Sequence, residues 1–127
     1  MRFDAKQPAR RFSVGIQGDI EISDCGSVSL DPREQVTFVT DNGGEYDVTR
    51  TDFGFYATPS LDQRLPRFGL RPVLIRNRDT LNHFVLLVED GKEEAFHAYL
   101  EAENLELVAR LDDKDLLLRL YDLNRQP

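Results

Sequence analysis

The sequence predicts an α+β protein: a mostly antiparallel β-sandwich or open barrel, followed by a C-terminal helix, strand and helix. Two patterns predict this class. Before residue 90, short segments of alternating apolar and polar residues recur about every eight residues between turn residues, which is typical of antiparallel sheets. After residue 90, apolar residues recur at helical spacing. The length of 127 residues and the hydrophobic content of 40% suit one domain with a single core.

We therefore expect a single domain over residues 1–127 with about seven to nine strands. Residues 1–11 carry several charges and few apolar side chains, so they are expected to form a flexible arm. Residues 12–89 should be rich in strands. Residues 90–124 should form the helix–strand–helix unit.

Short strands are expected near residues 12–16, 20–22, 28–30 and 36–40, where the apolar residues of each segment share one parity. The clearest turn is the Asp-Asn-Gly-Gly run at residues 41–44, because Asn and Gly tolerate the positive φ angles of tight hairpins. It should join the strand at 36–40 to a strand at 45–49. Residues 53–58 also alternate and extend the sheet until Pro59 ends it.

Two continuous apolar runs, residues 73–75 and 84–88, have the length of strands. Such runs are typical of strands covered on both faces, so they are the candidate central strands, joined by a turn at residues 77–82. Asp90 and Glu93 resemble a capping box and predict a helix over residues 91–103.

The end of the chain combines one more strand with one more helix. Residues 105–111 return to the alternating pattern of a strand. Asp112 or Asp113 then caps a last helix. The apolar stripe of this helix consists of Leu116, Leu117, Leu120 and Leu123.

Composition excludes several classes of function. The net charge of −7 argues against general nucleic-acid binding, which depends on a basic face. No apolar run is long enough to cross a membrane, and the N-terminal residues lack the apolar core of a signal peptide, so a cytoplasmic protein with no membrane partner is expected. Cys25 is the only cysteine, and no metal-binding, P-loop or dinucleotide-binding motif occurs. The sequence therefore predicts no metal site and no cofactor.

The charges are unevenly distributed along the chain. Residues 60–78 contain five arginines and one acidic residue, whereas residues 89–122 contain eleven acidic and four basic residues. The simplest interpretation is that the two segments solvate different faces or form ion pairs with each other. The functional interpretation is an anion-binding loop at residues 64–72, since two prolines and a glycine shape this segment and loops on a sheet are common binding platforms.

Clustered guanidinium groups bind phosphate or carboxylate through planar forks of donors. The candidate ligand-binding arginines are Arg64, Arg67 and Arg71 of the loop, with Arg50 and Arg76 near the ends of neighbouring strands. Tyr56 could stack on a sugar or base, because its parity is opposite to that of Phe53 and Phe55. The leading hypothesis is a small binding or accessory protein that recognises an anionic small molecule, a phosphorylated or nucleotide-linked sugar, without covalent chemistry.

Two alternatives stay open. A cofactor-free isomerase or lyase acting on an anionic sugar would need an acid–base pair, for which His83, Asp52 and Tyr56 are the candidate residues. A thiolate mechanism through Cys25 with His83 or His97 is the weaker catalytic option, since nothing in the sequence brings these residues together. An interaction protein would instead use the charge asymmetry, with the arginine loop of one chain meeting the acidic helices of another copy or of a partner protein.

Overall fold

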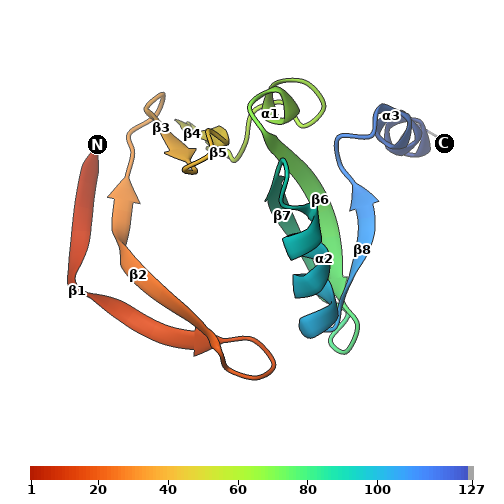
Figure 1. The fold of residues 1–127 in the computed structure, drawn as a ribbon. Helices are drawn as coiled ribbons and strands as arrows, with labels where there is room; N and C mark the ends of the chain where they lie inside the picture. Colours follow the sequence, from red (N-terminus) through yellow and green to blue (C-terminus); the bar gives the residue numbers. More distant parts are fainter. Residues whose placement is uncertain (126–127) are drawn as a thin grey trace.

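The structure is a computed structural model, and it describes residues 1–125 (Figure 1). The described chain is α+β, with eight strands in three separate antiparallel sheets and three helices, the last of them C-terminal. The predicted class is therefore confirmed, including the C-terminal helix–strand–helix. The sheets are not closed into a barrel.

The first sheet is a long hairpin of β1 (Arg2–Val14) and β2 (Ile20–Ser29), which bends near its middle (Figure 1). Its register shifts between Ala5 and Arg10. Residues 1–11 do not form the expected flexible arm, because residues 2–5 pair with residues 26–29 of β2. Gly26 makes this pairing close: it has a φ of +147°, and a Cβ there would lie 2.3 Å from the carbonyl oxygen of Asp4. Only glycine allows the two backbones to approach so closely.

The second sheet contains β3 (Gln35–Val39), β4 (Glu45–Thr51) and β5 (Gly54–Tyr56) in that order. The turn predicted at residues 41–44 joins β3 to β4, and Gly43 has a φ of +91° there. Val39 pairs with Glu45, and the ring of Phe38 stacks on that of Tyr46 with centroids 5.2 Å apart. Turn chemistry and cross-strand aromatic packing thus select the same register.

The third sheet has β6 (Leu70–Asn77) in its centre, with β7 (His83–Glu89) on one side and β8 (Leu105–Arg110) on the other. The expectation of two central strands therefore holds for β6 only, since β7 lies at an edge. Helix α2 (Glu93–Ala102) covers one face of this sheet (Figure 1). The core formed there consists of Val73, Ile75, Val88, Phe96, Leu100 and Leu105.

The two remaining helices lie outside this core. Helix α1 (Arg64–Arg67) is a single turn that leads into β6, and its Leu65 is fully buried. Helix α3 (Lys114–Leu123) follows β8 and has no buried residue. The predicted cap of α3 is confirmed, because the Asp113 carboxylate accepts hydrogen bonds from the amides of Asp115 and Leu116. The capping box expected at α2 is not formed; its first turn follows Lys92 and has no side-chain cap.

The described chain exposes a large surface for its size. It exposes 9272 Å², whereas a compact monomer of 14.6 kDa would expose about 6,900 Å². Phe84 and Val85 of β7 are 50% and 57% exposed, although the apolar run that contains them is typical of a covered strand. No helix among residues 1–125 has the length and apolar character needed to cross a membrane.

Candidate functional site

Most of the arginines in residues 60–78 lie beside carboxylates of the same chain. The Arg71 guanidinium lies 3.0 Å from Asp112 and 3.3 Å from Asp90, and hydrogen bonds to these two residues raise its pKa above the ordinary value. Arg76 pairs with Glu106, and this hydrogen bond lowers the pKa of the Glu106 carboxyl. Two nitrogens of each guanidinium are thus engaged within the chain, on different parts of the sheet. Arg71 and Arg76 do not converge on one point with the others.

Arg64 and Tyr56, in contrast, line one small cavity of about 230 Å³, which we call the polar cleft. The strands β3, β4 and β5 supply one side of it, and the segment from residue 58 to the start of α1 supplies the other. Its lining residues are Gln35, Asp47, Thr49, Tyr56, Thr58, Pro59, Ser60 and Arg64. Hydroxyl, amide, carboxylate and guanidinium groups therefore meet beside one aromatic ring.

The guanidinium of Arg64 is held from two sides. One of its terminal nitrogens lies 3.2 Å from the Asp47 carboxylate, and the group lies 5.4 Å above the centre of the Phe68 ring. Asp47 in turn accepts a hydrogen bond of 2.6 Å from the Thr37 hydroxyl and is only 15% exposed, whereas Arg64 is largely exposed. Asp47 and Phe68 thus orient Arg64 while leaving other guanidinium donors toward solvent.

The segment leading into α1 fixes the base of the cleft. The Ser60 hydroxyl accepts a hydrogen bond of 2.8 Å from the Arg64 amide, and the Ser60 carbonyl accepts one of 3.0 Å from Leu65. The buried side chain of Leu65 then anchors the turn against the protein. Across the cleft, the Thr49 hydroxyl donates to the Gln35 side-chain oxygen at 2.8 Å. These contacts hold the lining side chains of both walls.

Arg50 and Arg67 lie outside this group. Arg50 donates to the carbonyl of Gly54 at 3.3 Å and lies 5.7 Å above the centre of the Phe55 ring. Arg67 lines a separate hollow of about 270 Å³, which it shares with two acidic residues, Glu89 and Asp90. Of the loop arginines proposed as a cluster, only Arg64 lies in the polar cleft with Tyr56.

Of the residues proposed for acid–base chemistry, Asp52 and Tyr56 belong to the β4–β5 hairpin of the second sheet and His83 to the third sheet. His83 begins β7, whereas Asp52 lies in the turn between β4 and β5, where its carboxylate is 3.6 Å from Arg33. Tyr56 ends β5. Cys25 is an exposed residue of β2, and the ring of His97 packs against that of Phe96 on α2. Among residues 1–125 no group of three or more histidine, cysteine or acidic side chains is arranged to hold a metal ion.

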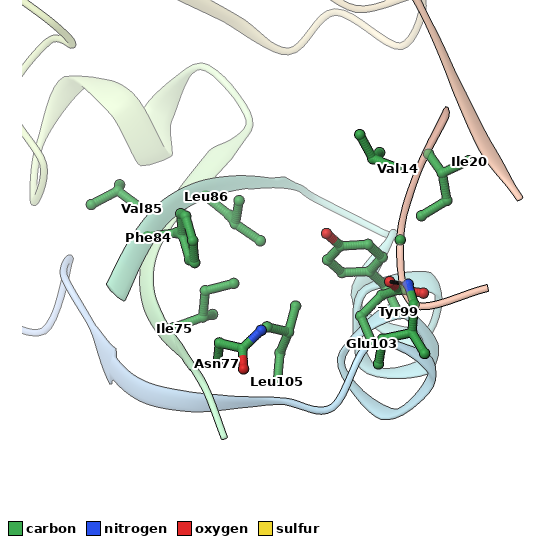
Figure 2. A pocket seen from close by; sticks show the side chains of 12 residues that line it. Val14, Ile20, Ile75, Asn77, Phe84, Val85, Leu86, Tyr99, Glu103 and Leu105 are labelled. Carbon is green, nitrogen blue, oxygen red and sulfur yellow. Dashed lines mark hydrogen bonds between the residues drawn. The ribbon is translucent and has the colours of Figure 1, made fainter. Parts of the chain in front are cut away.

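A cavity larger than the polar cleft was not predicted from the sequence. It has a volume of about 590 Å³ and lies between the tip of the β1–β2 hairpin, the start of β7 and the end of α2 (Figure 2). Figure 2 shows Tyr99 and Glu103 beside the hairpin, with Phe84 and Leu86 on the sheet side. Glu103, which follows α2, links this helix to the hairpin, since its carboxylate accepts a 2.8 Å hydrogen bond from the Ile16 amide.

This cavity adjoins the core, since Ile75 and Leu105 belong to both. Its apolar residues come from three distant segments of the chain, so no local motif could identify it. The only sequence signal was the apolar run at residues 84–88, which is richer in apolar residues than an exposed edge strand requires. A second hollow, of about 330 Å³, lies between β7 and the β3–β4 hairpin, and Val85 and Leu86 line both.

Comparisons with protein-family models, with curated proteins and with solved structures find no match for this chain.

Proposed function

We propose that this protein is a small binding or accessory protein that recognises an anionic sugar in the polar cleft, without covalent chemistry. The observation that carries the proposal is the meeting of Tyr56 and Arg64 in one cavity, with Asp47 orienting the guanidinium. A phosphate or carboxylate would accept hydrogen bonds from the Arg64 donors that Asp47 does not use. The sugar ring would stack on Tyr56, which is 66% exposed.

The other lining groups suit a polyhydroxylated ligand. Thr49, Thr58 and Ser60 offer hydroxyl groups, and Gln35 offers an amide. Sugars present donors and acceptors in alternation, so a wall of hydroxyl and amide groups can pair with either kind. A cavity of about 230 Å³ is smaller than the roughly 300–1,000 Å³ of typical ligand sites. The cleft would therefore hold one sugar with its anionic group, and any nucleotide would extend beyond it.

Binding is favoured over catalysis by the titratable groups in the cleft. Among residues 1–125, Asp47 is the only titratable residue lining the cleft apart from Tyr56 and Arg64, and this carboxylate is paired with Arg64. An isomerase or lyase needs a base that is free to take a proton from the substrate. His83, the candidate for this role, is not among the lining residues.

The proposal is tested by thermal-shift measurements at low salt with sugar phosphates, sugar acids and nucleotide sugars. A ligand at one hundred times its dissociation constant adds about 2.7 kcal/mol to the free energy of unfolding, which raises the melting temperature by several degrees. The shift should be lost in Arg64→Ala and reduced in Tyr56→Ala.

Arg119→Ala is the matched control, because Arg119 is an exposed arginine on α3, away from the cleft. It should keep the full shift. The absence of a shift with all three ligand classes, or an equal loss in Arg119→Ala and Arg64→Ala, would reject the polar cleft as the binding site.

A further inference from the structure

We propose that the free edge of β7 pairs with β7 of a second copy of this chain, antiparallel and about a two-fold axis. The two three-stranded sheets would then form one continuous sheet across a homodimer. Four observations support this: the unpaired backbone groups of β7, the lack of protection on this edge, the apolar hollows beside it, and the excess of exposed surface. The inference does not depend on the polar cleft.

The alternation of hydrogen bonds identifies the free groups. The amide of Asn77 donates to the carbonyl of Asn82, and the amide of Asp90 donates to the carbonyl of Gly69. In an antiparallel pair such bonds recur at every second residue, so the even-numbered residues between 82 and 90 direct their N–H and C=O groups toward β6. The odd residues Val85 and Leu87 therefore direct their N–H and C=O groups away from the sheet. Since β7 pairs with no other strand in the described chain, these groups are available to a second strand.

The two edges of this sheet differ in their protection. The β8 edge carries Glu106 and Arg110, and its register with β6 shifts around Val108. Charges and bulges of this kind keep sheet edges from pairing with other chains. The interior of β7 is an uninterrupted Phe-Val-Leu-Leu-Val run with no charge, proline or register shift. An edge with these properties is a template for strand addition.

Two hollows with apolar lining residues lie beside β7. Leu86 and Val88 pack on the α2 face, where the 590 Å³ cavity also involves Phe84. Val85 and Leu87 line the 330 Å³ hollow beside the β3–β4 hairpin. Val85 and Leu86, whose side chains point to opposite faces of the sheet, line both hollows. An added β7 would place its own apolar side chains beside these hollows on both faces.

The exposed area is sufficient for a dimer of this kind. The described chain exposes about 2,400 Å² more than a compact monomer of its mass. Obligate homodimers bury about 2,000–5,000 Å² in total, or roughly 1,000–2,500 Å² on each subunit. A second copy can therefore cover the excess. Because β7 of one copy would pair with β7 of the other, the contact has two-fold symmetry, and the two Leu86 residues lie opposite each other at its centre.

The experiment is sedimentation velocity on the full chain over a range of concentrations, with variants at one position. We expect a dimer for the parent protein. Val85→Pro removes one free edge N–H without removing a bond to β6, and proline is tolerated at such positions, so this variant should be a folded monomer. Val85→Lys introduces a charge into the same contact and should also be monomeric.

Val108→Lys is the matched control, because it places the same charge on a half-exposed valine of the other edge strand. It should remain dimeric. A second measurement fixes the register: Leu86→Cys, with Cys25→Ser, should form an intermolecular disulfide, since residues in a non-hydrogen-bonded antiparallel pair have Cα atoms about 4.5 Å apart.

A monomeric parent protein at all concentrations would overturn the proposal, and β7 would then be available only to a different protein. A dimer that persists unchanged in Val85→Pro and Val85→Lys would also overturn it, because the contact would lie elsewhere. Circular dichroism of each variant separates a folded monomer from an unfolded chain. If both Val85 variants unfold, the Leu86→Cys cross-link decides, and its absence overturns the proposal.

Discussion

The substitution Leu65→Ala tests whether α1 is anchored as the structure indicates. Leu65 is 0% exposed, so all three carbon groups that the substitution removes are buried. At roughly 0.8 kcal/mol for each group, the lost transfer free energy is about 2.4 kcal/mol. The cavity left in the protein raises the loss of unfolding free energy to about 3 kcal/mol.

Urea denaturation followed by circular dichroism measures this loss, at one fixed protein concentration because dissociation of the proposed dimer would otherwise contribute. Leu118→Ala on α3 is the control: this leucine is 60% exposed, and its truncation should change the free energy of unfolding by less than about 0.5 kcal/mol. A loss below about 1 kcal/mol for Leu65→Ala would refute the anchoring. The position of Arg64, one residue earlier, would then have no such support.

Three further predictions follow from local contacts. The hydrogen bond from Arg76 lowers the pKa of Glu106 in the folded state. The pair therefore stabilises the protein above the unfolded pKa of Glu106, and this effect is lost as the pH falls through the folded pKa. The free energy of unfolding of Glu106→Gln, measured by denaturation at a series of pH values, should be lower than that of the parent at pH 7 and converge with it in acid. Gly26→Ala should destabilise the β1–β2 pairing by about 1–3 kcal/mol and speed the amide hydrogen exchange of residues 2–5. Gly18→Ala is the control: a Cβ at Gly18 would meet no atom within 4 Å, so the amides of residues 2–5 should stay protected. Asp113→Ala should cost α3 about 1 kcal/mol, and because α3 has no buried residue, the loss should show as faster exchange of its first amides with the rest of the protein unchanged.

Local signals in the sequence predicted the parts of the fold that depend on neighbouring residues. The Asn-Gly-Gly turn defined the β3–β4 hairpin, and Asp113 defined the start of α3, since each acts within a few residues. The N-terminal half of β1 was missed although Phe3 and Ala5 alternate with charged residues, because the segment has few large apolar side chains and was judged by its charge. Its pairing includes ion pairs of Lys6 and Arg10 with Asp24 and a close backbone approach at Gly26, which no local alternation reveals.

Contacts between distant residues were the part that the sequence could not supply. The local pattern made β7 a central strand, but β8, about twenty residues later, occupies the other side of β6 and leaves β7 at the edge. The arginine cluster was likewise identified from neighbouring residues alone, without the carboxylates that pair with it. Its partners Glu106 and Asp112 lie 30 and 41 residues from Arg76 and Arg71, and this separation hid the ion pairs that occupy these two arginines. Tyr56 and Arg64 were predicted together because they are near in sequence as well as in space.

Mapping of ligand contacts by nuclear magnetic resonance tests the central claim most directly. A uniformly ¹⁵N-labelled sample is titrated with a sugar phosphate that stabilises the protein, and amide shifts are followed to saturation. The polar cleft predicts that the largest changes fall in residues 47–49 and 56–64 and that Arg64→Ala abolishes them. Saturable changes centred elsewhere, with residues 56–64 unmoved, would contradict the proposed site.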